Sequence, residues 1–237
     1  MSFALPPELW ASLWLTLRLA GITTLILLAI GIPLAHWLNT TRLEGAFLLE
    51  ALITLPIVLP PTVIGFYLLV LMAPQQPMGR AWVTLFGEPL PFSFTGLVIG
   101  SVIYSLPFAV QPIQSAFRGV RGALIEQALS LGLTRWQTFL YVDLPLSRNG
   151  ILTGASLSFA HTLGEFGVVL MLGGNIPGQT RVASIALYDE AQKLNYDVAH
   201  SYALILLVIS FTLLAAIAWL QRRQRAVGLG DTLLMRH

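Results

Sequence analysis

Five long apolar stretches run along the chain, and short segments rich in charged and polar residues separate them. The stretches are Leu9–Leu38, Ala46–Met72, Phe94–Ala116, Ile151–Leu172 and Ala199–Leu220. Each reaches the roughly 20 residues that a helix needs to cross hydrocarbon. Helix is expected because hydrocarbon gives backbone groups no other hydrogen-bonding partners. The pattern predicts an all-α, polytopic membrane bundle of about five transmembrane helices, with residues 1–237 as a single transmembrane domain.

Composition supports the membrane class. Hydrophobic residues make up 56% of the chain and charged residues 10%, against about 25% charged residues in a soluble domain. The chain has no cysteine, which excludes disulfides and thiolate metal ligands. The histidines are scattered, so neither a metal site nor a cofactor site is expected. The lipid bilayer is the expected surrounding, and no nucleic-acid partner is expected.

Basic residues are distributed unevenly between the two sides of the predicted bundle, and cytoplasmic loops are typically the richer ones. The richer side carries Arg42, Arg118, Arg121, Arg135, Arg148, Arg222, Arg223, Arg225 and Arg236. The other side carries Arg80, Arg181 and Lys193. With five spans, the N-terminus is predicted to be periplasmic and residues 221–237 to form a cytoplasmic tail. Arg18 lies inside the first span, near its outer end.

The two longer outer segments differ in predicted structure. Residues Pro74 to Pro91 read as a loop containing Pro and Gly, and residues Asn175 to Val198 include a helix-compatible piece at Ser184–Lys193. Lys193 is the one lysine in the chain and lies in no phosphate-binding G-x-x-x-x-G-K-[ST] frame. The chain is therefore not expected to be an enzyme, and any ATP that drives its activity is hydrolysed by another subunit.

Residues 118–149 form the most informative segment. Apolar residues recur there at helical spacing on both sides of Gly132, which is suited to the left-handed conformation that ends a helix. Thr134 and Gln137 have the spacing of a capping box that starts the next helix. The segment predicts a cytoplasmic helix–turn–helix. Its apolar stripe is compatible with a helix pair resting on the bilayer or with a docking surface for a cytoplasmic partner.

The same segment resembles the EAA motif of ATP-binding-cassette (ABC) importer permeases, which reads E-A-A, three residues, G, nine residues, I-x-L-P. Gln127 and Val142 depart from that pattern. The resemblance implies that the segment couples transport to the ATPase through Glu126, Ala128, Gly132, Trp136, Leu144 and Pro145. It also implies a homodimer of permeases, cytoplasmic ATP-binding subunits and an extracytoplasmic binding protein.

Two further runs are similar to molybdate permeases. They are L-P-I-V-L-P-P-T-V-I-G at residues 55–65, and L-G-E-F-G at 163–167 followed by G-G-N-I-P-G-Q-T-R at 173–181. The resemblance implies a pathway for molybdate, or for the closely similar tungstate, across the inner membrane. Sulfate and thiosulfate permeases share the general plan and are the alternative. The substrate oxyanion would be selected mainly by the binding protein.

Polar and proline residues inside the spans are candidates for the pathway or its gate. His161 and Glu165 lie four residues apart, as neighbours on one helical face would. An ionisable residue at membrane depth suggests function, although a structural helix contact is an equal alternative. Prolines in the second span indicate either a tolerated kink or a broken helix lining the pathway. The candidate residues are Pro60, Pro61, Thr62, His161, Glu165 and Phe166.

Other classes of membrane protein fit less well. A secondary transporter usually has inverted repeats and several intramembrane acidic residues, whereas this chain has one glutamate at depth and no evident repeat. An intramembrane enzyme would need a nucleophile with its base, or a set of metal ligands. A simple channel agrees with the composition but has no use for an EAA-like segment.

Overall fold

The computed structural model describes residues 8–120 and 122–234, with side chains described up to residue 219. These residues form helices and no strands, as the sequence predicted. The helices are α1 (Leu9–Thr40), α2 (Ala46–Val58), α3 (Pro61–Met72), α4 (Pro77–Phe86), α5 (Phe94–Arg118), α6 (Gly122–Ser130), α7 (Arg135–Thr138), η1 (Phe139–Asp143, a π-helix), α8 (Leu144–Leu146), α9 (Arg148–Leu163), α10 (Gly167–Gly173), α11 (Ala183–Gln192) and α12 (Tyr196–Leu234).

Three of the predicted spans are continuous helices that are long and apolar enough to cross a membrane, namely α1, α5 and residues Tyr196–Trp219 of α12. Helix α12 continues to Leu234, so the expected tail is helical to that point, and its last three residues lie outside the described ranges. The structure has up to five spans if each of two bent helix pairs is counted as one.

The second predicted span was expected as one stretch and is instead two helices. Helices α2 and α3 meet at an angle of 115°. The Leu59 N–H bonds to the Leu55 carbonyl, whereas the N–H groups of Val63 and Ile64 bond to the Pro60 carbonyl. Pro60 and Pro61 have no N–H of their own. The hydrogen-bond ladder therefore stops and restarts at this point, and the prolines break the helix rather than merely kink it.

The fourth predicted span is also broken, between α9 and α10, with a bend of 59°. Helix α9 ends at Leu163, and α10 restarts at Gly167. Between them the Glu165 carbonyl accepts a hydrogen bond of 2.6 Å from the Ser184 hydroxyl of α11. The prediction that His161 and Glu165 share one helical face is therefore wrong, because the helix ends between them.

Each of the two longer outer segments contains a helix, one of which was predicted from the sequence and one of which was not. The helix expected at Ser184–Lys193 is present as α11. The segment Pro74 to Pro91 was expected to be a loop but contains α4. Gly87, at φ 80°, ends α4 in the left-handed region that favours glycine.

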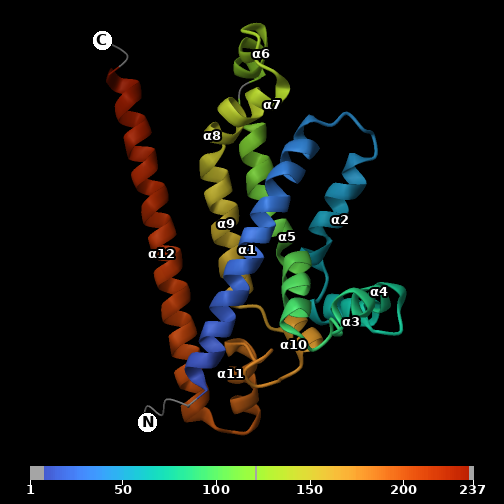
Figure 1. Ribbon diagram of the computed structural model, residues 1–237. Helices are drawn as coiled ribbons and strands as arrows, with labels where there is room; N and C mark the ends of the chain where they lie inside the picture. The colour runs from blue at the N-terminus through green and yellow to red at the C-terminus, as the bar shows by residue number, and fades with distance from the viewer. Residues whose placement is uncertain (1–7, 121, 235–237) are drawn as a thin grey trace.

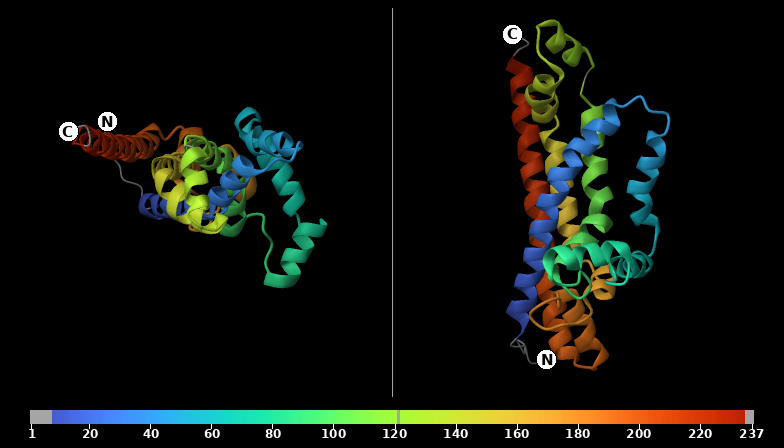
Figure 2. Two further views of the ribbon diagram at one scale, coloured as in Figure 1. Left: turned by 90° about the horizontal axis from the view of Figure 1, so that it is seen from above. Right: turned by 45° about the vertical axis from the view of Figure 1, so that its right-hand side comes forward.

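The elements divide into a central group and two flanking arms. Helices α1, α5 and α9 pack on one another; α12 stands along one side of this group, and α2, α3 and α4 lie on the other (Figures 1 and 2). Helices α6 and α7 and the end of α12 lie at one end of the molecule, hereafter the α6 end. Helix α11 and the start of α1 lie at the opposite end, the α11 end (Figure 1).

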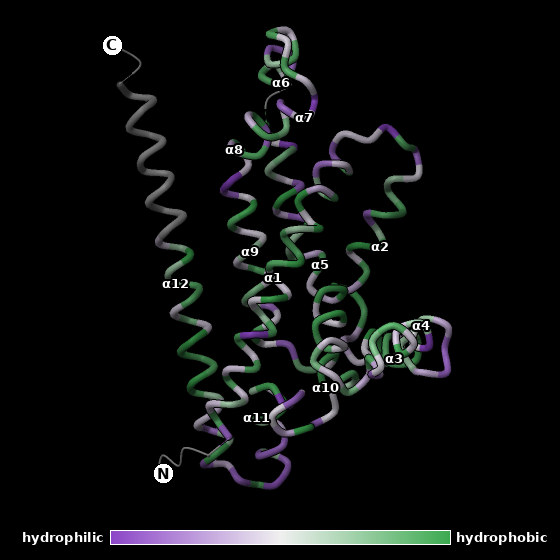
Figure 3. The backbone as a smooth tube through the Cα atoms, viewed as in Figure 1, coloured by the Kyte–Doolittle hydropathy of each residue, from purple (hydrophilic) through white to green (hydrophobic). Residues whose placement is uncertain are grey.

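Hydropathy follows this arrangement. Hydrophilic segments gather around α6 and α7 at one end and around α11 at the other, with mainly apolar helix between them (Figure 3). The largest buried cluster joins α1, α3, α5 and α10 through residues that include Leu19, Leu68, Leu97 and Leu172. Outside the core, large apolar side chains are exposed on α2, α3 and α12, where a membrane protein meets lipid or another subunit.

Candidate transport site and coupling segment

The two helix breaks touch each other. A Cβ on Gly167, the first residue of α10, would lie 2.8 Å from Cβ of Pro61, the first residue of α3. A Cβ on Gly65, one turn into α3, would lie 2.7 Å from Cβ of Met171 in α10. Both distances are shorter than side chains allow, so glycine at these two positions permits the close approach of two short helices.

A polar group between α5 and α9 surrounds His161. Its Nδ1 lies 2.9 Å from the Ser105 hydroxyl, which in turn lies 3.1 Å from the Thr162 hydroxyl. The imidazole stacks on the Phe108 ring, with centroids 3.9 Å apart, and tilts toward Tyr104 at 4.8 Å. His161 is thus held by α5 on its ring face and at Nδ1, and can act as a structural link between the two helices.

Glu165 is buried in the second break, with 4% of its surface exposed. The Ser101 hydroxyl of α5 lies beside its carboxylate, although neither carboxylate oxygen has hydrogen-bond geometry with any described group. The neighbouring Phe166 precedes α10 and tilts against the Tyr188 ring of α11, with centroids 4.9 Å apart. The Glu165 side chain therefore lies buried where the second break meets α5.

The segment at the α6 end has the local geometry that its sequence predicted. Gly132 has φ 87°, in the left-handed region, and follows α6 directly after Leu131. The capping box is complete: the Gln137 N–H donates to the Thr134 hydroxyl at 3.2 Å, and the Thr134 N–H donates to the Gln137 side-chain oxygen at 2.8 Å. Both features fix the turn between α6 and α7.

The outer face of this segment is apolar and uncovered. Leu131 is 82% exposed and Trp136 is 67% exposed, and Glu126 is also exposed, whereas Ala128 is buried. Exposed leucine and tryptophan side chains on a short helix pair are typical of an interaction surface. The exposure agrees with both interpretations left open by the sequence, a helix pair resting on the bilayer and a docking surface for a partner.

The inner face of the segment is attached to the bundle by an aromatic contact. The Phe139 ring of η1 lies 4.4 Å from the His36 ring of α1 and 6.1 Å from the Phe117 ring of α5. Asp143 Oδ2 lies 3.7 Å from His36 Nδ1. Burial raises the pKa of the Asp143 carboxyl, and nearby His36 opposes that rise. Packed side chains of η1, which follows α7, thus join this segment to α1 and α5.

The C-terminal part of the motif supports this attachment. Leu144 packs against the same buried cluster as Phe139, whereas Pro145 is exposed at the start of α8. Pro is favoured at a helix start because its missing N–H would have no partner there. The motif residues therefore divide between an exposed face and a face fixed to the bundle.

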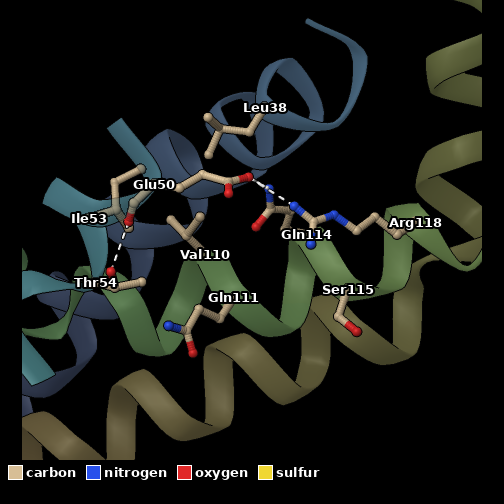
Figure 4. Close-up of a pocket in the computed structure, with 9 residues that line it drawn as sticks. All are labelled: Leu38, Glu50, Ile53, Thr54, Val110, Gln111, Gln114, Ser115 and Arg118. Carbon is tan, nitrogen blue, oxygen red and sulfur yellow. Dashed lines mark hydrogen bonds and ion pairs between the residues drawn. The ribbon is translucent and has the colours of Figure 1, made fainter. Parts of the chain in front are cut away.

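A cavity of about 290 Å³ lies between α2 and α5 at the α6 end (Figure 4). The Gln114 side-chain amide donates to Glu50 Oε1 at 2.6 Å, and Arg118 Nη2 donates to the same oxygen at 2.8 Å. Thr54, Gln111 and Ser115 also line the cavity. This site was not predicted from the sequence, because Glu50 and Arg118 lie 68 residues apart. The four-residue spacing of Gln114 and Arg118 on a helix was a signal that could have pointed to it.

The α11 end holds a different charged cluster around Arg181. Its Nη1 donates to Glu8 at 2.9 Å, and its Nη2 donates to Asp189 at 2.7 Å and Glu190 at 3.3 Å. The hydrogen bond from Lys193 lowers the pKa of Asp189, an effect that burial opposes. Burial would raise the pKa of Glu190, but bonds from Lys193 and Asn195 outweigh it and lower the pKa. This cluster links the start of α1 to α11.

The structure brings the predicted gate residues into two neighbourhoods. Pro61 and Thr62 lie against Gly167, next to Phe166, whereas His161 and Glu165 face α5. Pro60 and Thr62 are exposed at the first break.

Arg18, expected near the outer end of the first span, has its guanidinium 4.5 Å from the Phe94 ring centroid. Among the described residues, no group of His, Asp and Glu is arranged to hold a metal ion.

Comparison with known proteins places the chain among transport proteins. The family described as "Binding-protein-dependent transport system inner membrane component" matches residues 28–226. The "Molybdenum transport system permease protein ModB" of Azotobacter vinelandii is 49% identical over 209 residues, covering 87% of this chain and 92% of that protein. The "Sulfate transport system permease protein CysT" of Escherichia coli (strain K12) is 33% identical over 224 residues, covering 94% and 80%.

Solved structures agree on the fold. A bacterial ABC transporter involved in the import of the acidic polysaccharide alginate has a chain similar to this one, with a TM-score of 0.76 and 19% identity, covering 92% of this chain and 80% of that chain. An inward-facing structure of the MetNI methionine ABC transporter has a TM-score of 0.72 and 17% identity, covering 94% and 99%.

Proposed function

This chain belongs to the family of binding-protein-dependent transport system inner membrane components, and we propose that it is the permease subunit of an ATP-driven importer of molybdate. The observation that carries the proposal is the 49% identity to a molybdenum permease along nearly the whole of both chains. A sulfate or thiosulfate permease is the second candidate, supported by the 33% identity to a sulfate permease. The difference in identity favours molybdate, or tungstate, as substrate.

The proposed assembly contains two copies of this chain, two cytoplasmic ATP-binding subunits and a periplasmic oxyanion-binding protein. The α6 end then faces the cytoplasm and the α11 end faces the periplasm. The distribution of basic residues supports this orientation. Exposed apolar side chains on α2, α3 and α12, such as Val58, Phe66 and Phe211, are available for lipid and for the second copy.

In the proposed mechanism, the α6–α7 pair binds a groove of the ATPase through Leu131 and Trp136. Closure of the two ATPases upon ATP binding shifts this pair, and the Phe139–His36 contact passes the shift to α1 and α5. Helices α3 and α10, which meet at the two breaks, then change position and open or close the pathway. The helix breaks suit such a role, because each allows one half of a span to move without the other.

The substrate is tested by ATPase stimulation in liposomes that contain the whole transporter. Binding protein loaded with molybdate or tungstate is expected to stimulate ATP hydrolysis, and sulfate-loaded binding protein is not. Stimulation by sulfate alone would overturn the molybdate assignment in favour of the second candidate.

The coupling segment is tested by Gly132→Asp. A side chain at φ 87° strains the turn, and a carboxylate there adds a charge to the apolar docking face. The ATPase subunits are expected to be lost when the permease is purified, while Gly122→Asp, at the exposed start of α6, serves as a control for added charge. Retention of the ATPase by Gly132→Asp would contradict the docking role.

The gate role of the second break is tested by Glu165→Gln, which keeps the shape of the side chain and removes its ability to ionise. We expect uptake to fall and the ratio of molybdate transported to ATP hydrolysed to change, because the carboxylate lies where α5 meets the break. If uptake and ATP coupling are both unchanged, Glu165 is a structural residue and not part of the gate.

A further inference from the structure

The cavity between α2 and α5 has an unusual lining for a surface inside a membrane. Gln111 and Ser115 are exposed on α5 within the span, and Thr54 of α2 joins them in the cavity wall. Polar side chains are better solvated by water than by hydrocarbon. This face of α5, in the last turns of the helix, is therefore suited to water or a polar solute.

The cavity is also rich in hydrogen-bond donors directed at a single anion. Gln114 and Arg118 are one turn apart on α5, and both donate to Glu50 Oε1 (Figure 4). A guanidinium carries five N–H donors and a side-chain amide two, so one carboxylate oxygen engages only a few of them. The Gln114 side chain is buried at 8% exposure, which fixes the direction of its donors.

In the observed state, then, the Glu50 carboxylate occupies an anion position formed by α5. Glu50 comes from a different helix, α2, which ends at the break before Pro60. A movement of α2 away from α5 would withdraw the carboxylate and leave Gln114 and Arg118 facing the cavity. A cavity of about 290 Å³ is large enough for a small ion with part of its water shell, since a water takes about 30 Å³ in the liquid.

We propose that Gln114 and Arg118 form a low-affinity oxyanion site at the cytoplasmic end of the pathway, and that Glu50 closes it as a built-in competitor. The ligand class is a small tetrahedral dianion, for which a planar guanidinium offers paired donors. Competition from Glu50 keeps the affinity low, which suits release rather than capture. The assignment of this site to the cytoplasmic end of an import pathway rests on the proposed function. The binding test below does not depend on that function.

The test measures equilibrium binding of radiolabelled molybdate, and separately of sulfate, to the purified permease–ATPase complex without binding protein or ATP. Glu50→Gln removes the competing charge and is expected to raise binding about tenfold, the effect of one charge-assisted hydrogen bond gained by the ligand. Arg118→Ala is expected to lower the weak binding of the wild type, and to abolish the gain when combined with Glu50→Gln. Any binding to the ATPase remains constant across these variants.

Arg42→Ala is the matched control, since Arg42 is an exposed arginine in the loop between α1 and α2 at the same end. If Arg42→Ala lowers binding as much as Arg118→Ala, or if Arg118→Ala and Glu50→Gln both leave binding unchanged, the site is overturned. Absence of molybdate uptake by the wild type, together with a gain of sulfate binding in Glu50→Gln, would instead keep the site and overturn the substrate. Arg118→Ala keeps the test decisive if Glu50→Gln does not assemble.

Discussion

Two arginines at opposite ends of the molecule contact carboxylates in very different ways. The Arg118 side chain is 57% exposed and shares one oxygen of Glu50 with Gln114. The Arg181 side chain is 10% exposed, and its two terminal nitrogens contact three carboxylates, from Glu8, Asp189 and Glu190. The same residue type thus serves as an available donor at one end and as a neutralised structural link at the other.

The comparison shows that the neighbours of a cation, and not its presence, decide whether it can bind a passing anion. An oxyanion approaching Arg181 would meet three negative charges, whereas one approaching Arg118 competes with a single carboxylate. It follows that loss of Arg181 should reduce stability and loss of Arg118 should reduce anion binding.

The largest effect is expected from Arg181→Met, which leaves three carboxylates facing one another. Removing one partner of a buried ion pair costs about 3 kcal/mol or more. The variant is expected to aggregate at a clearly lower temperature, measured by size-exclusion chromatography of heated, detergent-solubilised protein. Arg80→Met, at an exposed position of α4, is the control. Equal stability of both variants would remove the distinction between the two arginine clusters.

A second, smaller loss of stability is expected when the pH is lowered. The pKa values of Asp189 and Glu190 are lowered from ordinary values of 3.8 and 4.5. Their contribution to stability is therefore fully present above those ordinary values and is lost as the pH falls through the lowered ones. Heated wild-type protein should lose stability below about pH 4, and the Lys193→Met variant, which lacks the hydrogen-bond donor to both carboxylates, should lose less over the same range. Parallel curves would show that the Lys193 hydrogen bonds do not contribute.

Glu50→Gln is expected to change stability by less than about 1 kcal/mol, because its ion pair with Arg118 is half exposed and such pairs contribute little. Thermal aggregation of the variant should match that of the wild type. A loss as large as that of Arg181→Met would mean that the Glu50–Arg118 pair is a structural link like the one at the α11 end.

The smallest effect is expected from Lys193→Met. Lys193 contacts Asp189 and Glu190 at 2.8 Å and 3.1 Å, but its side chain is 52% exposed. Solvent and salt screen such contacts, so we expect a shift in aggregation temperature that disappears at high salt. A shift that persists at high salt would place Lys193 among the structural residues of the cluster.

Local signals in the sequence predicted the local structure well. Gly132 and the Thr134–Gln137 pair have the conformations that their residue types favour, because turns and caps depend on neighbouring residues. Helix α4 was missed because it is short and has Pro77 and Gly79 in its first turn, although Met78, Trp82 and Leu85 recur at helical spacing. The all-α fold followed from the apolar stretches alone.

Features that depend on distant contacts could not be predicted in the same way. Prolines permit a kink or a break in a membrane helix, and the 115° angle between α2 and α3 depends on packing against α10 through Gly65 and Gly167. The position of Glu165 required knowing that α9 ends at Leu163. The Glu50–Arg118 pair joins residues in separate helices, and no pattern along one helix identifies the partner.

The contact between the first and the last spans has a consequence for how the chain is made. Leu9 and Leu13 of α1 are buried in a cluster with Ala183, Ala186 and Tyr202. The ribosome synthesises α12 last. The start of α1 is therefore in the membrane without α11 and α12 for most of synthesis. A chain truncated before Tyr196 lacks Tyr202 and should leave these leucines only partly covered, and we expect quality-control proteases to degrade it before it can recruit a partner.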